Sequence, residues 1–206
     1  MKKGSSLKDP LNIILAGVGG QGNVMASRVL ANMLSLKGFR ITIGETFGMS
    51  QRGGSVMSHI RVSATSTWSP QIPRGKADIL IALEPIEAVR VMRVYGNPEA
   101  KVVLNTRPIH PVGVIAGELD YPALENIEKG LNSLTPHVWM LDATEEAMKL
   151  GNPILSNIIM IGALCGLNLL PVGITEFKAV IKNFFPEKHL AINRQAFEIG
   201  KEKVRN

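Results

Sequence analysis

Residues 11–22 read LNIILAGVGGQG, an apolar run that ends in a cluster of glycines. The run at 11–16 has the length of one strand and is almost wholly apolar, which is typical of a strand covered on both faces of its sheet. Residues 22–37 follow with apolar side chains three and four positions apart, and this spacing predicts a helix with one buried face. Strand, glycine turn and helix in this order predict an α/β fold.

The rest of the chain continues the alternation of strands and helices. Further strands are expected at 40–44, 55–63, 78–83, 101–104 and 137–141, and further helices from near Pro85, at about 122–134, from Asp142 or Thr144 to 150, at about 153–167, at 174–183 and at 186–204. Only about ten residues connect the strands at 40–44 and 55–63, whereas a parallel crossover needs about a dozen or more. The strand at 55–63 is therefore predicted to run antiparallel to its neighbours. We expect a single domain over residues 1–206, a three-layer, Rossmann-like α/β domain with a mixed sheet and a helical C-terminal end.

The composition limits the classes of function. Of 206 residues, 45% are hydrophobic and 19% are charged, and the formal net charge is +6. This charge favours an acidic partner or a phosphorylated ligand, but the basic residues are scattered and aromatics are few, which argues against nucleic acid. The single cysteine, Cys165, excludes a disulfide within the chain and an iron–sulfur or zinc site built on several thiolates. Its apolar surroundings in the sequence predict an inert core residue.

A long uncharged segment lies between Lys149 and Glu176, and its longest wholly apolar run, at 158–167, has ten residues. A membrane span needs about 20, so we expect a buried or interface helix here and no membrane partner. The N-terminus has no signal-peptide pattern, which favours a cytoplasmic protein.

The glycines of the opening stretch match G-x-G-x-x-G between a strand and a helix, where backbone N–H groups at the start of the helix can face a phosphate. The candidate ligand contacts are Gly17, Gly19, Gly20, Gln21 and Gly22. A tight structural turn without a ligand is the alternative. A nicotinamide dinucleotide is disfavoured, because the acidic residue nearest the expected place, Glu45, lies 23 residues beyond Gly22 and opens a long loop.

A second glycine-rich loop, at 45–54, reads ETFGMSQRGG. An arginine before two glycines places a guanidinium beside exposed backbone, which suits a phosphate, a carboxylate or a partner surface. The candidates are Glu45, Arg52, Gly53 and Gly54, with Glu45 orienting the arginine. A solvated arginine in a turn is the alternative. Both loops are expected to meet at the carboxyl edge of the sheet, where open α/β folds bind ligands.

No catalytic residue is predicted. The sequence contains no Ser/His/Asp or Cys/His arrangement, no paired carboxylates and no histidines with metal-ligand spacing. His59 and Arg61 share one face of the strand at 55–63, but a half-exposed polar face accounts for them as well as a site does. The residues alone therefore favour a subunit or accessory domain over a complete enzyme.

Two stretches, AGVGGQG at 16–22 and ETFGMSQRGGSVMSHIR at 45–61, resemble the gamma domain of 2-oxoacid:ferredoxin oxidoreductases. The resemblance spans nearly the whole chain and includes ADILIALEP at 77–85 and NTRPI at 105–109. Its most specific part is 50–61, which within the family is most similar to the beta, or small, subunit of indolepyruvate:ferredoxin oxidoreductases.

The resemblance implies a subunit of an enzyme that decarboxylates an aryl 2-oxoacid on thiamine diphosphate, passes electrons through [4Fe-4S] clusters to ferredoxin and transfers the acyl group to coenzyme A. It implies that thiamine diphosphate and the clusters belong to the large (alpha) subunit, the expected partner. This chain alone would then bind no cofactor, with coenzyme A as a shared substrate. A pyruvate or branched-chain 2-oxoacid enzyme is the closest alternative. A stand-alone NAD(P)-dependent oxidoreductase and a non-catalytic scaffold protein are alternatives outside the family.

Overall fold

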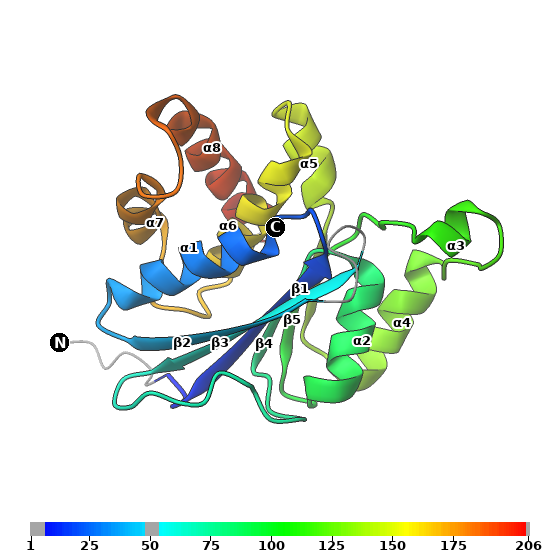
Figure 1. Ribbon diagram of the computed structural model, residues 1–206, viewed down its shortest axis with the longest axis horizontal. Helices are drawn as coiled ribbons and strands as arrows, with labels where there is room; N and C mark the ends of the chain where they lie inside the picture. Colours follow the sequence, from blue (N-terminus) through cyan, green and yellow to red (C-terminus); the bar gives the residue numbers. More distant parts are fainter. Residues whose placement is uncertain (1–6, 48–53, 205–206) are drawn as a thin grey trace.

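The computed structural model describes residues 7–47 and 54–204, which form a six-stranded sheet with helices on both faces (Figure 1). The strand order is β2-β3-β1-β4-β5-β6. The strands are β1 (Leu11–Val18), β2 (Arg40–Phe47), β3 (Ser55–Ser63), β4 (Ile79–Ala82), β5 (Lys101–Asn105) and β6 (Val138–Leu141). The predicted three-layer α/β fold with a mixed sheet is confirmed.

The helices divide between the two sides of the sheet (Figure 1). One side carries α1 (Asn23–Ser35), α5 (Ala143–Lys149), α6 (Ser156–Gly166), α7 (Ile174–Ile181) and α8 (Glu187–Lys203). The other carries α2 (Pro85–Tyr95) and α4 (Leu124–Leu134), while the short helix α3 (Val112–Ile115) projects from the loop between β5 and α4. A 3-10 turn, η1 (Pro153–Leu155), leads into α6, and the predicted helical C-terminal end comprises α6, α7 and α8.

The strand β3 makes the sheet mixed. It pairs antiparallel with both β1 and β2, as the short connection predicted, while β1, β4, β5 and β6 pair in parallel. β1 and β2 therefore run in the same direction but lie two strand spacings apart, about 10 Å. The prediction was wrong about the end of β2. Because the pairing with β3 continues to Phe47, Glu45 lies inside β2, opposite Ser58, and not at the start of a loop.

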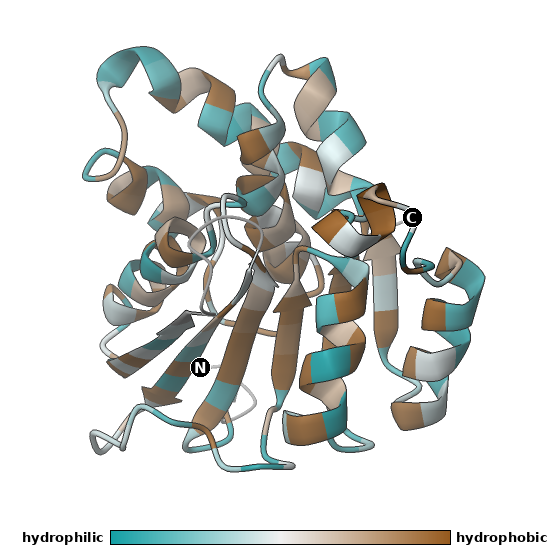
Figure 2. Ribbon diagram, turned by 45° about the vertical axis from the view of Figure 1, so that its right-hand side comes forward, coloured by the Kyte–Doolittle hydropathy of each residue, from teal (hydrophilic) through white to brown (hydrophobic). Residues whose placement is uncertain are grey.

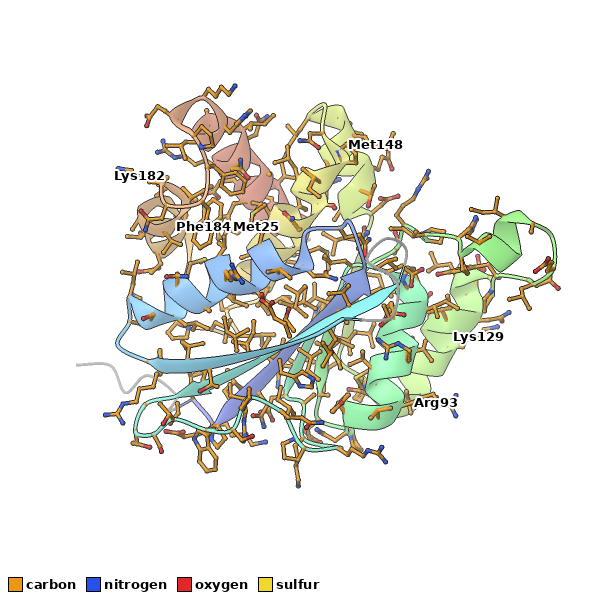
Figure 3. The ribbon with its side chains drawn as sticks, in the orientation of Figure 1. Met25, Arg93, Lys129, Met148, Lys182 and Phe184 are labelled. Atoms are coloured by element: carbon orange, nitrogen blue, oxygen red, sulfur yellow. The ribbon has the colours of Figure 1, made fainter. Side chains whose placement is uncertain are left out.

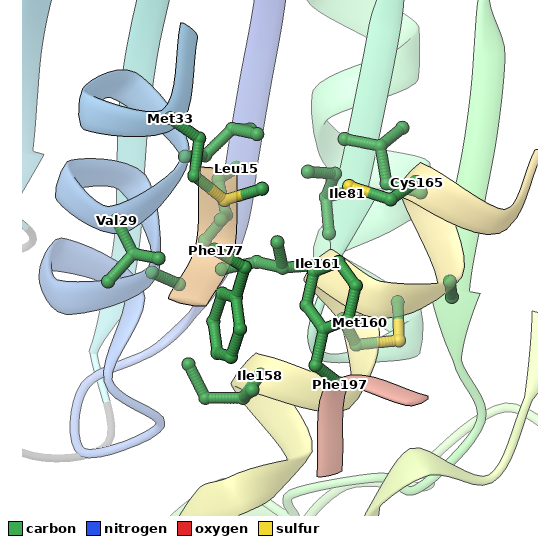
Figure 4. Close-up of a cluster of buried hydrophobic side chains, with 14 of the residues drawn as sticks. Leu15, Val29, Met33, Ile81, Ile158, Met160, Ile161, Cys165, Phe177 and Phe197 are labelled. Atoms are coloured by element: carbon green, nitrogen blue, oxygen red, sulfur yellow. The ribbon is translucent and has the colours of Figure 1, made fainter. Parts of the chain in front are cut away.

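Alternate residues of β1 serve two separate apolar cores. Ile13 and Leu15 belong to the core beneath α1, α6, α7 and α8, whereas Ile14 and Ala16 belong to the core beneath α2 and α4. All eight residues of β1 are buried, as its apolar sequence predicted. In the first core Phe177 and Phe197 stack with ring centroids 4.4 Å apart (Figure 4). The strands are mostly apolar along their length, while the outer helices are mixed (Figure 2).

The helix α6 is buried throughout, because all eleven of its residues lie within the protein. Glycines let it approach α8 backbone to backbone. A Cβ atom on Gly162 would lie 2.0 Å from the carbonyl oxygen of Phe197, and one on Gly200 would lie 1.8 Å from the carbonyl oxygen of Ile159. The predicted buried helix at 153–167 is thus confirmed, with its first turn formed by η1. Among the described residues, no helix is long and apolar enough to span a membrane.

His59 and Arg61, expected on a half-exposed sheet face, are instead 1% and 7% exposed. The connection from β3 to β4 covers them. His59 Nδ1 accepts a hydrogen bond from the backbone N–H of Ile72 at 3.3 Å, and burial lowers the pKa of the ring, which favours the neutral form. Arg61 donates to the side-chain oxygen of Asn12 and lies over Trp68. Both side chains therefore hold the 64–77 connection on the sheet.

The contact between α6 and α8 predicts opposite effects for two glycine substitutions. Gly162→Ala should destabilise the protein by about 1–3 kcal/mol, since its methyl group forces the helices apart. Gly130→Ala, in the interior of α4, meets no atom within 4 Å and should stabilise by up to about 1 kcal/mol through helix propensity. Urea unfolding of both variants measures the difference. Equal changes in the free energy of unfolding would contradict the close-packing account.

Candidate functional site

The candidate site begins where β1 ends and the glycine turn leads into α1. Gly20 and Gly22 have φ angles of +104° and +79°, in the left-handed region that side chains other than glycine rarely adopt. Gly22 also caps α1, with no side chain over the first backbone N–H groups of the helix. The turn therefore leaves free donors at a positive helix end, an arrangement that suits an anion.

The side-chain amide of Gln21 connects this turn to the sheet by hydrogen bonds. Its Oε1 accepts a hydrogen bond from the backbone N–H of Val18 at 2.7 Å, and its Nε2 donates to the carbonyl oxygen of Leu83 at 2.7 Å. Gly17 makes room for this amide, because a Cβ there would lie 2.5 Å from Gln21 Oε1. The structure thus gives the side chain of Gln21 a positioning role in the turn.

Asn157, in the first turn of α6, holds the glycine turn from the other side. Its Nδ2 lies 3.3 Å from the carbonyl oxygen of Gln21 and 3.5 Å from that of Gly22. The side-chain Oδ1 atoms of Asn157 and Asn23 are both buried and accept no hydrogen bond from the described residues. Buried acceptors without a donor are uncommon, so these two asparagines leave unsatisfied oxygens beside the turn.

Cavities lie on both sides of the turn. One has a volume of about 250 Å³ and is lined by Gly20, Gln21, Arg107, Ile109, Thr144, Asn152, Pro153, Ile154 and Ser156. The other, of about 300 Å³, is lined by Val18, Gly19, Gly20, Gly22, Asn23, Val24 and Val56. Both therefore place the glycine turn within reach of a bound ligand at the carboxyl edge of the parallel strands.

Arg107 gives the first cavity a positive charge that sequence reasoning did not assign. It follows β5 by two residues, and its side chain is exposed. Just before it, Asn105 donates to the carbonyl oxygen of Leu83 and to Thr144 Oγ1, both at 3.0 Å. These bonds fix the end of β5 beside the end of β4 and the start of α5. The signal in the sequence was the NTRPI stretch at 105–109, whose arginine follows a buried strand.

The two predicted loops meet where the structure describes them. The backbone N–H of Gly19 donates to the carbonyl oxygen of Gly54 at 2.8 Å, which agrees with the expected convergence. Arg52 and Gly53 lie outside the described residues. Glu45 pairs with Arg28 of α1 at 3.7 Å, and β3 separates its strand from β1. The structure thus brings Gly17 to Gly22 and Gly54 together and places Glu45 on the far side of β3.

The chain lacks the donors for an iron–sulfur cluster. Its single thiol, Cys165, is buried in α6, and burial raises the pKa of this thiol to about 12. A cluster needs several thiolates, so the residues of this chain do not fit one. Among the described residues, no group of three or more His, Cys, Asp and Glu side chains could hold a metal ion.

Fold and site together define a Rossmann-like α/β domain with a mixed sheet and an anion-suited turn at its carboxyl edge. The sequence profile of the pyruvate ferredoxin/flavodoxin oxidoreductase family matches residues 12–203. The chain belongs to this family, which confirms the resemblance seen in the glycine loops.

Individual relatives match nearly the full length of the chain. Indolepyruvate oxidoreductase subunit IorB of Archaeoglobus fulgidus is 39% identical, with 92% of this chain and 93% of the relative covered. Pyruvate synthase subunit PorC of Methanothermobacter marburgensis is 31% identical, with 95% and 98% covered. The fold also matches 2-oxoglutarate:ferredoxin oxidoreductase from Magnetococcus marinus, solved with 2-oxoglutarate, coenzyme A and succinyl-CoA bound. There the TM-score is 0.74 at 20% identity, over 96% of this chain and 31% of that one.

The contact between Asn157 and the glycine turn predicts unequal costs for two matched substitutions. Gly20→Ala and Gly22→Ala each place a side chain in the left-handed region, at about 1–2 kcal/mol. A Cβ on Gly22 would also lie 2.2 Å from Asn157 Nδ2, while one on Gly20 meets nothing within 4 Å. Gly22→Ala should therefore lower the free energy of unfolding more, by a further 1–3 kcal/mol or so.

The additional loss of stability in Gly22→Ala, relative to Gly20→Ala, should depend on Asn157. A double-mutant cycle of Gly22→Ala with Asn157→Ala, followed by urea unfolding, should show a favourable coupling that the same cycle with Gly20→Ala lacks. Zero coupling in the Gly22 cycle would show that Asn157 does not shape the turn.

Proposed function

We propose that this chain is the small subunit of a heteromeric indolepyruvate (aryl 2-oxoacid):ferredoxin oxidoreductase. The observation that carries the proposal is the 39% identity to an indolepyruvate oxidoreductase subunit over nearly the full length of both chains. In the proposed reaction, an aryl 2-oxoacid is decarboxylated oxidatively, coenzyme A takes the acyl group and ferredoxin takes the electrons. The products are an arylacetyl-CoA, carbon dioxide and reduced ferredoxin.

The chemistry of the chain supports a division of labour between two subunits. One buried thiol with a raised pKa cannot ligate a cluster, so the [4Fe-4S] clusters are placed on the large subunit. Thiamine diphosphate is placed there too. The small subunit then contributes binding groups and shape, and the electrons reach ferredoxin through the assembled complex. The relatives' description as subunits supports this arrangement.

Coenzyme A is the ligand that we propose for the carboxyl edge of the sheet. The backbone donors at the start of α1 and the guanidinium of Arg107 are suited to its phosphates. Arg52, beside Gly53 and Gly54, is proposed to supply a second positive charge from the other loop. The Magnetococcus marinus protein with this fold was solved with coenzyme A bound, which makes coenzyme A the natural candidate among phosphorylated ligands.

Two alternatives have less support. A pyruvate enzyme is supported by the lower identities of 31% and 29% to two pyruvate synthase subunits. NAD(P) is disfavoured by topology, because β3 separates β2 from β1 and so moves Glu45 about 10 Å from the place where the acid of a dinucleotide site belongs.

Reconstitution tests the proposed function. The isolated chain should show no turnover, because it lacks the redox groups. Mixed with the large subunit, it should restore indolepyruvate-dependent reduction of ferredoxin or a viologen dye in the presence of coenzyme A. Pyruvate, assayed in parallel, should be the poorer substrate by kcat/KM. Turnover by this chain alone, or no effect of adding it to the large subunit, would contradict the proposal.

The ligand assignment is tested by arginine substitutions in the assembled enzyme. Arg52→Ala and Arg107→Ala should each raise the KM for coenzyme A by about tenfold to a hundredfold, since a charge-assisted contact contributes about 1.5–3 kcal/mol. Arg93→Ala is the matched control, because Arg93 is exposed on α2, well away from the glycine turn (Figure 3). Wild-type KM values for coenzyme A in both test variants would contradict the assignment of coenzyme A to this edge of the sheet.

A further inference from the structure

The segment 109–119 exposes several large apolar side chains that do not contribute to the core of this chain. Val112, Ile115 and Leu119 are 81%, 74% and 63% exposed, and Ile109 is 38% exposed. α3, which lies within this segment, buries none of its residues. The bonds within α3 and its C-terminal turn are local: the carbonyl oxygen of Pro111 accepts from Val114 and Ile115, and that of Gly113 accepts from Glu118 and Leu119. A four-residue helix without buried side chains contributes almost nothing to folding.

These side chains form a patch, whereas the other large exposed apolar residues of the described chain are dispersed. Leu36 lies at the end of α1, Trp68 in the 64–77 connection and Met148 on α5. Figure 1 shows α3 projecting from the body of the domain, beyond α2 and α4. Contiguous exposed apolar side chains of this kind are typical of protein interfaces.

The patch borders a pocket with an acidic floor. The pocket has a volume of about 240 Å³, and Ile109, Pro111, Val114 and Leu119 of the patch line it together with Glu84, Glu87 and Asp120. Glu84 is 2% exposed and caps α2, accepting from the backbone N–H of Glu87 at 3.0 Å. Tyr121 also donates to Glu84, and burial together with this carboxylate raises the pKa of the phenol, which keeps it a neutral donor. Glu87 is paired with Arg90 of α2, so Glu84 and Asp120 remain as the acidic groups of the pocket beneath its apolar walls.

The surroundings of the patch are acidic as well, although the whole chain carries a formal charge of +6. Between Arg107 and Lys129 the sequence contains no Lys or Arg and four acidic residues, namely Glu118, Asp120, Glu125 and Glu128. A second copy of this chain, docked through the same patch about a two-fold axis, would bring these acids against one another, which is unfavourable. The complementary partner presents apolar side chains around a basic group.

Resting on the proposed function, we infer that residues 109–122 and the acidic pocket form the docking surface for the large subunit. A Lys or Arg side chain of that subunit enters the pocket beside Asp120 and above Glu84, and its apolar neighbours cover Val112 and Ile115. The fold of this chain makes up 31% of a longer chain in the Magnetococcus marinus enzyme, where it is joined covalently to the remainder. A separate subunit needs a surface to replace that covalent link.

Ile109 places this surface beside the candidate ligand site. It lines both the acidic pocket and the cavity that contains Gly20 and Arg107. Docking of the large subunit on 109–122 therefore closes one side of that cavity, so that a ligand there contacts both subunits.

The test measures the affinity of the full-length chain for the large subunit. Val112→Asp and Ile115→Asp should each weaken binding by about tenfold or more, because a charge replaces an interface aliphatic. Their unfolding midpoints should match the wild type, since α3 buries nothing. Leu36→Asp, a change at a residue that is 59% exposed directly after α1, is the matched control and should bind normally. Asp120→Lys should weaken binding more at low salt than at high salt.

The outcomes separate this inference from the proposed function. If the wild-type chain binds the large subunit and both aspartate variants bind equally well, the docking surface is wrong while the proposed function stands. If the wild-type chain does not bind the large subunit at all, both fail. Concentration-dependent dimerisation of the wild-type chain that Val112→Asp abolishes would assign the patch to a second copy and overturn the inference.

Discussion

The backbone contact between α6 and α8 holds the candidate site in place. Gly162 and Gly200 have no side chains, so the two helices approach until a methyl group on either would overlap a carbonyl oxygen. This approach buries α6 completely between the sheet and α8. Asn157, in the first turn of the buried helix, is then fixed against the carbonyl oxygens of Gln21 and Gly22. The packing of α6 against α8 thus positions a side chain that shapes the glycine turn.

The antiparallel strand β3 explains why the site lacks the acidic residue of a dinucleotide-binding fold. A dinucleotide fold places an acid from the neighbouring strand beside the glycine turn, but here β3 occupies that position and Glu45 pairs with Arg28. The turn keeps its free backbone donors without the group that selects a nucleotide ribose. Combined with a single buried thiol, this geometry suits a subunit that binds a ligand, which agrees with our proposal that the redox centres lie on the large subunit.

Local sequence patterns predicted most of the fold but only part of the site. The glycine turn, the antiparallel strand and the buried C-terminal helix followed from spacing, connection length and apolar runs. The positions of Arg107 and Asn157 beside the turn could not be predicted in this way, because each reaches the turn from a segment far along the chain. The burial of His59 and Arg61 was missed for the same reason, since the 64–77 connection that covers them has no regular pattern. Glu45 was misplaced because pairing with β3 extended β2.

We propose that the ligand and the large subunit meet this chain at one edge of its sheet. Hydrogen–deuterium exchange of the chain, free and in complex with the large subunit, tests it most directly. We predict slower exchange on assembly in two segments, 19–23 and 109–122, and further slowing at 19–23 when coenzyme A is added. Unchanged exchange in both segments, with protection confined to the opposite edge of the sheet, would contradict it.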